Sequence, residues 1–292
     1  MTRPYRSVVV AALAATLLGL TAPTIDGGER RSHADRLPPC PVDQPPPTTA
    51  PVGVPSLADP TACRARPSRV ERAADGQLPT PRPGYHHLGA TTAGDWNAIT
   101  GRLEVRRTGV RPGRYDFVAT RFLAKQDQHG QVAWLEVGWA DTGWSGDGAP
   151  QVYAFDSTAM SWRFFDAYRL RDRDRLWVYL HGADATTWYA WLWWGTRWQL
   201  LAAAELPMGA TAQLEQYVEV HLDRSGHAGP FPVPPISVDR VRVSPAPGRP
   251  FVPWRPEWVP TVRPADSPFY CLTWNNRYHS WAAGGCPDTV QG

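Results

Sequence analysis

Two glutamates on predicted β-strands, Glu136 and Glu219, are the residues of this sequence best suited to chemistry. Each lies in a run of alternating residues, so it points to the side opposite its aliphatic neighbours. Histidines occupy equivalent positions, His181 on a third run and His221 two residues after Glu219. Two carboxylates in a partly dry groove can have their pKa values driven apart and so divide the roles of acid and base. The glutamates are therefore the candidate catalytic pair if the protein is an enzyme.

Aromatic side chains share the faces that carry these titratable groups. The runs AWLEVGW, RLWVYLH and YVEVHL each have an aliphatic face and an aromatic face, and the latter carries Trp134, Trp177, Tyr179 and Tyr217. If the three runs lie on one concave sheet, these residues line a groove together with both histidines. Flat aromatic rings cover a sugar ring or an extended peptide at a low entropy cost. The alternative is an ordinary outer face on which each glutamate pairs with an arginine.

Short alternating runs, separated by turn sequences, position these residues. They include GRLEVRR, YDFVATRF, QVAWLEVGW, PQVYAFD, SWRFF, RLWVYLH, TTWYAWLWW, RWQLLAA and AQLEQYVEVHLD. Strands at roughly ten-residue spacing with turns such as SGDGAP and RDRD predict an antiparallel β-sandwich or barrel that begins near Tyr85. No amphipathic helix interrupts them. In TTWYAWLWW both faces are aromatic, so one sheet alone cannot bury that strand.

The order of these motifs resembles a known family. WLEVGWADTGWSGDGAPQVYAFD, then WRFFDAY, RLWVYLHG, an aromatic strand and LEQYVEV are similar to the concanavalin-A-like (jelly-roll type) β-sandwich of the glutamic peptidases, the eqolisins. They also resemble uncharacterised secreted actinobacterial proteins of the same layout. In eqolisins a W-x-Q-x-G strand supplies a catalytic glutamine, and a later strand supplies the glutamate that activates water. The resemblance places Glu136 at the glutamine and Glu219, or alternatively Glu215, at the glutamate.

This departure from the family pattern bears directly on activity. A glutamine amide can donate a hydrogen bond to a developing oxyanion, whereas an ionised glutamate cannot. Glu136 could replace the glutamine only when protonated, a state that a second nearby carboxylate at acidic pH would favour. A glycosidase using the same pair is a separate possibility, with its stereochemistry set by the carboxyl separation.

The two ends of the chain differ from its centre. Residues 1–22 combine Arg3, Arg6 and a short apolar run, as in a secretory signal peptide; the alternative is an uncleaved membrane anchor. Residues 23–84 are rich in proline and predict a mostly disordered leader, acting as a linker or as a wall-crossing spacer. Residues 85–292 are assigned to the sandwich domain. After Asp223 an extended wrap is expected, with aromatic anchors; the alternative is a small independent binding module.

The cysteines and the net charge indicate where the protein is located and which partners it does not bind. Four cysteines in an exported chain predict two disulfides, and the preferred of three pairings joins Cys40 to Cys63 and Cys271 to Cys286. Removal of Arg3 and Arg6 from the 30 basic residues leaves 28 against 27 acidic ones. A near-neutral chain is a poor candidate for nucleic-acid binding. No run after the signal peptide is apolar enough to span a membrane, so the protein is expected to be secreted or held at the cell surface.

Other chemistry finds little support in the sequence. The eight histidines lack metal-ligand spacing, and there is no nucleophile elbow or phosphate-binding glycine loop. The turns at Asp172–Asp174 and Ser145–Gly148 could hold calcium, but turn chemistry explains them equally well. No metal and no cofactor is predicted. The sequence favours a secreted, non-catalytic β-sandwich whose aromatic groove binds an extended extracellular polymer, glycan or peptide. The alternatives are an acid hydrolase using Glu136 and Glu219, and a surface structural module without a ligand.

Overall fold

The computed structural model describes residues 33–41, 44–47, 49–72, 84–128, 130–145, 148–223 and 229–286, all within the compact unit Ser32–Gly292. These residues form strands, apart from one four-residue 3-10 helix, η1 (His33–Arg36). Within them no helix is long and apolar enough to cross a bilayer. The predicted signal peptide lies outside the described residues.

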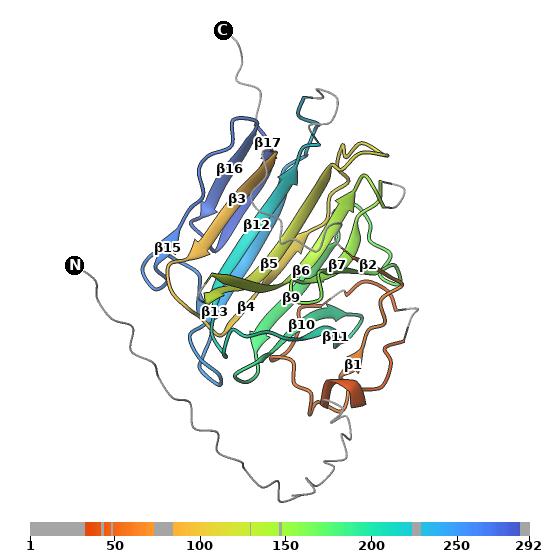
Figure 1. Cartoon of the computed structure of the whole chain (residues 1–292), viewed down its shortest axis with the longest axis vertical. Coiled ribbons are helices and arrows are strands. Elements are labelled where there is room, and N and C mark those ends of the chain that lie inside the picture. Colours follow the sequence, from red (N-terminus) through yellow and green to blue (C-terminus); the bar gives the residue numbers. More distant parts are fainter. Residues whose placement is uncertain are drawn as a thin grey trace, which may run out of the picture. The chain divides into compact units, whose positions relative to one another are not determined.

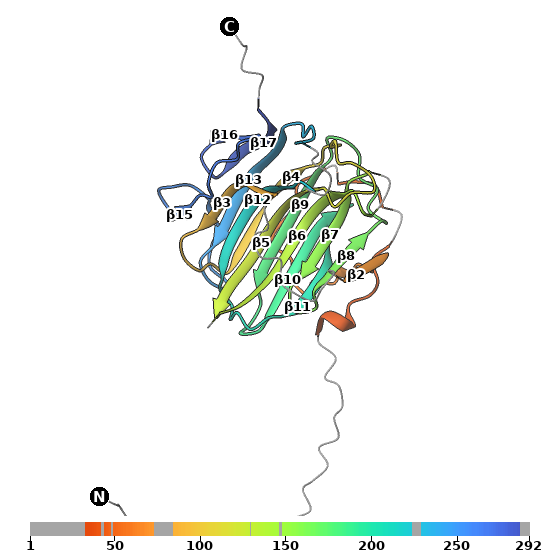
Figure 2. The same cartoon turned by 45° about the horizontal axis from the view of Figure 1, so that its top comes forward.

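The strands pair into two sheets, which Figures 1 and 2 show as two stacked layers. The first, here called the β9 sheet, has nine described strands. In spatial order they are β1 (Cys63–Arg64), β11 (Arg197–Glu205), β10 (Thr187–Trp194), β9 (Arg175–Gly182), β4 (Ala98–Glu104), β13 (Ile236–Ser244), β17 (Ser280–Gly285) and β16 (Tyr270–Asn276), with β14 (Val252–Pro253) paired to β13.

The second sheet, here called the β6 sheet, has eight described strands. In spatial order they are β15 (Thr261–Val262), β3 (Tyr85–Thr92), β12 (Gln213–His221), β5 (Phe117–Gln128), β6 (Gln131–Thr142), β7 (Gln151–Asp156), β8 (Ser161–Phe165) and β2 (Arg69–Arg72). Every pairing is antiparallel except the two-residue contact of β1 with β11. The predicted all-β antiparallel sandwich is confirmed.

Alternation within the strands accounts for the core between the sheets. The predicted aliphatic faces point inward and are buried in one cluster, which includes Val137, Val178 and Val218. Trp139 is fully buried there, and its indole N–H donates a hydrogen bond of 3.0 Å to the carbonyl oxygen of Glu104. Because buried apolar side chains occur at every second residue, each strand has only one register that fills the core.

The N-terminal segment differs from the sequence-based expectation of a mostly disordered leader up to residue 84. Among its described residues, β1 and β2 extend the two sheets, and Ala34 and Ala62 are buried. They belong to the same cluster as Tyr189, Trp191 and Trp193, which form the outward face of β10. The physical reason is the aromatic character of both faces of β10, since the outward rings leave water only when another segment covers them.

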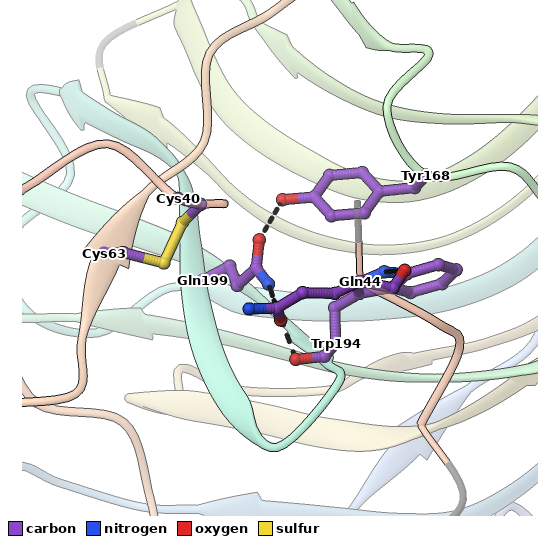
Figure 3. The surroundings of a disulfide bond; sticks show 6 residues. All are labelled: Cys40, Gln44, Cys63, Tyr168, Trp194 and Gln199. Atoms are coloured by element: carbon purple, nitrogen blue, oxygen red, sulfur yellow. Dashed lines mark hydrogen bonds between the residues drawn. A yellow bond between two sulfur atoms is a disulfide. The ribbon is translucent and has the colours of Figure 1, made fainter. Parts of the chain in front are cut away.

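A disulfide and a hydrogen-bond network hold this segment in place (Figure 3). Cys40 is bonded to Cys63, as predicted, and Cys271 to Cys286. The carbonyl oxygen of Gln44 accepts a 2.8 Å hydrogen bond from the indole of Trp194. The Gln199 side chain donates to the side chain of Gln44 at 3.3 Å and accepts from the hydroxyl of Tyr168 at 2.5 Å.

Removing the first disulfide tests how much it contributes. The double variant Cys40→Ser, Cys63→Ser is expected to lower the free energy of unfolding by about 3 kcal/mol, because a 23-residue loop is no longer closed in the unfolded chain. Urea-induced unfolding followed by far-UV circular dichroism measures the change. A loss under about 1 kcal/mol would show that the noncovalent contacts hold the segment alone.

After β12 the chain does form an ordered wrap. Its strands β13, β16 and β17 join the β9 sheet, and Trp254 and Trp281 are fully buried against the core. The indole of Trp281 donates to the side-chain oxygen of Gln216, on β12 of the opposite sheet. Trp258 differs from these anchors because 54% of its surface is exposed.

Candidate functional site

The residues predicted to line one groove are divided between the outer faces of the two sheets. Trp134 and Glu136 on β6 and Tyr217, Glu219 and His221 on β12 belong to the β6 sheet. Strand β9, which carries the other three predicted residues, pairs with β4 and β10 in the β9 sheet. The assumption that all three runs share one sheet is therefore wrong. The physical reason is that a strand with one aliphatic and one aromatic face can belong to either sheet, with its aliphatic face toward the core and its aromatic face outward.

Strand β5 lies between β12 and β6 and brings a residue that the sequence analysis missed, Arg121. Its register partners are Tyr217 on β12 and Gly138 on β6. A diagonal offset of two residues along the neighbouring strands then places Glu136 and Glu219 beside it. Alternation in YDFVATRF places Arg121 on the face opposite Phe122. The sequence does not show, however, that this strand lies between β12 and β6.

Arg121 is the centre of a buried charge cluster. Its Nε donates a 2.8 Å hydrogen bond to Glu219, whose carboxylate also lies 2.8 Å from a terminal guanidinium nitrogen. The Oε2 of Glu136 lies 3.0 Å from the same Nε, and Glu215 accepts a 3.3 Å hydrogen bond. Arg121, Glu136 and Glu219 are only 5%, 7% and 8% exposed. Because Glu136 and Glu219 contact one guanidinium, the predicted pair does come together.

Lys125 and His87 complete the cluster. Lys125 donates a 2.9 Å hydrogen bond to Glu215 from the partly exposed rim. The imidazole of His87, on β3, lies 3.4 Å from Glu219. The three glutamates thus outnumber Arg121 and Lys125 by one negative charge unless His87 is protonated or one carboxyl group is neutral.

The pKa values of Glu136 and Glu219 shift in opposite directions, which accounts for this excess of negative charge. Burial raises the pKa of Glu136 to about 8; Arg121 opposes this rise, and the charges of Glu219 and Glu215 add to it. For Glu219 burial acts in the same direction, but Arg121 and His87 outweigh it and hold its pKa well below the usual range. Glu136 is therefore the protonated member at neutral pH and Glu219 the ionised one.

Gly138 makes room for this arrangement next to Arg121. A Cβ atom on Gly138 would overlap the backbone carbonyl oxygen of Thr120, on the neighbouring strand β5. The variant Gly138→Ala is expected to lower the free energy of unfolding by about 3 kcal/mol, because β5 and β6 would have to separate. Urea-induced unfolding measures this change. Gly94→Ala is the matched control, since a Cβ there meets no atom within 4 Å, and an equal loss in both variants would contradict the explanation.

The aromatic residues predicted on this face pack against one another. Trp134 stacks on Phe155 with ring centroids 5.7 Å apart, and His221 stacks on Phe117 at 5.4 Å. The Nδ1 of His221 donates a 2.6 Å hydrogen bond to the carbonyl oxygen of Tyr115. Because Trp134, Tyr217 and His221 are all more than 90% buried, the structure gives them packing roles on the β6 sheet.

On the β9 sheet, two of the three predicted residues line an open cavity. It has a volume of about 530 Å³, and both Trp177 and Tyr179 contribute to its wall. The remaining lining residues are Pro51, Gly53, Val54, Thr100, Trp198, Arg240, Arg242, Phe251 and His279. A second cavity of about 270 Å³ shares Trp177 and Arg240 and adds Arg102, Arg175 and the described leader residues Pro47, Thr49 and Ala50. We call these two cavities together the aromatic–arginine site.

His181, the third predicted residue of β9, does not line either cavity. Its Nε2 accepts a 3.2 Å hydrogen bond from the indole of Trp191, and its ring packs against Tyr179 and Tyr189. Burial lowers the pKa of His181 to about 4, so the imidazole is neutral at physiological pH. His181 is therefore a partly buried hydrogen-bond acceptor on the outer face of the β9 sheet.

The N-terminal segment forms one wall of the aromatic–arginine site. The indole of Trp193 donates a 3.1 Å hydrogen bond to the carbonyl oxygen of Thr49, and Trp194 donates to that of Gln44. Trp193 lies on the outward face of β10 and Trp194 in the core between the sheets, so the proline-rich segment is held through its backbone from both sides of this strand. Among the described residues no group of three or more histidine, cysteine, aspartate or glutamate side chains is placed to hold a metal ion.

Comparison with known proteins identifies distant likenesses among solved structures. No protein-family model and no curated protein matches the chain. The scytalido-glutamic peptidase with a transition-state analogue inhibitor is similar at 12% identity and a TM-score of 0.49, covering 68% of this chain and 98% of that one. SCP-B of the eqolisin family, in complex with the tripeptide Ala-Ile-His, is similar at 11% identity and 0.46, covering 70% and 98%. The strand pairing described above, rather than this likeness, defines the fold.

Proposed function

We propose that this protein acts outside the cell as a non-catalytic binding protein, and that the aromatic–arginine site on the β9 sheet holds an extended extracellular polymer. The observation that carries the proposal is the 530 Å³ cavity, which Trp177, Tyr179, Trp198 and Phe251 line on the outside of the sandwich. Two disulfides and the absence of a membrane-spanning helix in the described residues are consistent with an extracellular protein.

The shape and chemistry of the site suit an extended ligand. The two cavities share Trp177 and Arg240 and so are neighbours on the outer face of the sheet. Aromatic rings supply contact area at a low entropy cost, because they have few torsions to immobilise. A site built in this way gains most of its affinity from repeating units that lie along it.

The leader supports the choice of an extended ligand for this face. Residues 44–47 and 49–54 read QPPP and TAPVGV, which is the composition of an extended polyproline-type segment. On the outer face the indole N–H of Trp193 donates to the carbonyl oxygen of Thr49, as aromatic grooves do when they recognise proline-rich peptides. The same outer face thus binds an extended chain within the molecule and leaves a cavity beside it.

The lining favours binding over catalysis. Among the described residues, the walls of both cavities contain no carboxylate, serine or cysteine, so they offer neither a carboxylate pair nor a common nucleophile. The polar groups that remain include those of the arginines, His279, Tyr179, Thr49 and Thr100. A polymer bound here would be held and oriented without being cut.

The binding proposal is tested with immobilised mature protein and a panel of soluble polymers, measured by biolayer interferometry. The panel contains poly-L-glutamate, poly-L-proline, poly-L-lysine, polygalacturonate and xylan. We expect at least one polymer to bind, and Trp177→Ala to weaken that binding at least tenfold. Trp258→Ala is the matched control, because Trp258 is exposed away from the lining residues. Failure of every polymer to bind, or equal loss in both variants, would contradict the proposal.

A second candidate, an acid hydrolase on the β6 sheet, rests on one specific observation. Glu136 and Glu219 contact the same guanidinium and have pKa values shifted in opposite directions. A protonated Glu136 could donate the hydrogen bond that an amide gives in the glutamic peptidases, while Glu219 stays ionised to activate water. The burial of the pair beneath their neighbours counts against access for a polymer.

This second candidate has a separate test. Mixed peptide and polysaccharide substrates are incubated with the mature protein between pH 3 and pH 8, beside the double variant Glu136→Ala, Glu219→Ala. Cleavage by the parent protein that the double variant loses would establish the hydrolase. Absence of cleavage by both proteins would leave the glutamates as a structural charge cluster.

A further inference from the structure

A β-bulge in β13 places a charged residue, Arg240, at the wall of the aromatic–arginine site. The pairing of β13 with β4 shifts between Asp239 and Arg242, so two residues of β13 stand opposite Gly101 alone. Arg240 sits in the bulge with φ at +56°, a conformation that non-glycine residues adopt rarely. The extra residue places two consecutive side chains, Asp239 and Arg240, on the outer face, and Arg242 lies on the same face because Val241 between the two arginines is buried in the core. A strained residue kept at a cavity wall points to a function there.

The arginines around the cavity fall into two groups. Arg102 and Arg175 bind one acceptor, Asp239, with three hydrogen bonds of 2.8 Å. Arg242 donates 2.8 Å to the carbonyl oxygen of Phe251, and Arg240 lies 5.9 Å from the ring centroid of Trp177. No carboxylate among the described residues forms an ion pair with Arg240 or Arg242. Two arginine charges at the cavity therefore face solvent uncompensated.

The described leader residues that wall the site do not neutralise these charges. Its residues 44–58 contain no acidic side chain, and the next carboxylate, Asp59, accepts hydrogen bonds from Thr61 within its own turn. The guanidinium carbon of Arg240 lies 5.9 Å from the ring centroid of Trp177, and this contact with a ring leaves the guanidinium N–H groups for an acceptor. Paired guanidinium donors of this kind match a carboxylate.

We propose that the polymer bound at this site is an extended acidic peptide, an inference that rests on the proposed binding function. Its carboxylates pair with Arg240 and Arg242, and its apolar side chains contact Tyr179, Trp198 and Phe251. A peptide fits better than an acidic glycan for two reasons. The same face already binds one backbone carbonyl oxygen, that of Thr49, through the indole N–H of Trp193. The ring of Trp177 has the guanidinium groups of Arg102 and Arg240 within 5.9 Å, which takes up surface on which a sugar would stack.

Poly-L-glutamate is the probe for this inference, measured by biolayer interferometry on the mature protein at 50 mM and 500 mM salt. We expect poly-L-glutamate to bind more tightly than poly-L-proline, poly-L-lysine and polygalacturonate, and to weaken in high salt, because partly exposed ion pairs are screened. The double variant Arg240→Gln, Arg242→Gln is expected to lose at least tenfold in affinity. The double variant Arg249→Gln, Arg114→Gln removes the same charge outside the lining residues and is expected to bind within twofold of the parent.

The possible results separate this inference from the binding function on which it rests. Tight binding of poly-L-proline that depends on Trp177 but not on Arg240 and Arg242 would keep the binding function and overturn the acidic specificity. Tighter binding of polygalacturonate would replace the peptide by a glycan. Equal losses in the two arginine double variants would show that net charge alone attracts the probe. Failure of every polymer to bind would overturn both proposals.

Discussion

Replacing Arg121 with methionine is expected to lower the free energy of unfolding by about 3–5 kcal/mol at neutral pH. The guanidinium is shared by Glu136, Glu215 and Glu219, and all four side chains are buried. Without it, three carboxylates lie together where burial penalises the charged form. Methionine keeps much of the volume of the side chain, so the loss reports on charge more than on packing. Urea-induced unfolding at pH 7 measures the difference.

A surface arginine supplies the control for this variant. Arg173 is 77% exposed and lies 3.8 Å from Asp172, and Arg173→Met is expected to change stability by less than about 1 kcal/mol. The deficit of Arg121→Met is also expected to shrink at acidic pH, where the carboxylates bind protons. A loss under about 1 kcal/mol at pH 7 would mean that the glutamates do not depend on Arg121.

The second large effect concerns Glu136 and Glu219, which contact the same guanidinium. Replacing each of them with glutamine is expected to change the free energy of unfolding in opposite directions. Because the pKa of Glu136 is raised to about 8 in the folded protein, the native state binds more protons than the unfolded chain between about pH 4.5 and pH 8. Stability of the parent protein therefore falls as the pH rises through this window. Glu136→Gln removes the titration, so this variant is expected to gain stability relative to the parent from pH 5 to pH 9.

Glu219→Gln is expected to behave in the opposite way. The folded pKa of Glu219 lies well below its unfolded value, so its stabilisation is present above the unfolded pKa and is lost as the pH falls below about 4.5. The variant is expected to be about 2 kcal/mol less stable than the parent at pH 7, because a charge-assisted hydrogen bond to Arg121 is lost. The deficit closes toward acidic pH.

Both variants are measured by urea-induced unfolding at pH 3, 5, 7 and 9, with the slope of each transition compared with that of the parent. Each substitution replaces a carboxylate by an amide of nearly the same size, so each serves as the matched control of the other. Parallel pH trends in the two variants would contradict the division of protonation states between Glu136 and Glu219.

Much of the secondary structure could be predicted from the sequence, because alternation is a local property. Nine alternating runs correspond to strands, and SWRFF coincides with β8 over Ser161–Phe165. The faces followed as well: Val137, Val178 and Val218 are inward, and Glu136 and Glu219 are outward. The cysteine pairing also followed, since near neighbours in the chain are the easiest to bring together.

The site was only partly predictable. The sequence analysis brought Glu136 and Glu219 together correctly, but it missed Arg121, which separates their protonation states. It also joined Trp177 and Tyr179 to Trp134 on one face, although β9 and β6 belong to different sheets. Alternation assigns a residue to one side of its strand and does not state which strands are neighbours.

The sequence by itself therefore determined nine of the strands and their inner and outer faces, and it favoured the observed disulfide pairing, since each depends on residues close together in the chain. Only the tertiary structure decided three features: which strands share a sheet, that the proline-rich leader covers the outward rings of β10, and that a bulge places Arg240 at the cavity. The physical reason is distance along the chain. Arg121 meets Glu219 across 98 residues, and the pKa of a buried carboxyl group is set by whatever charge lies beside it in space.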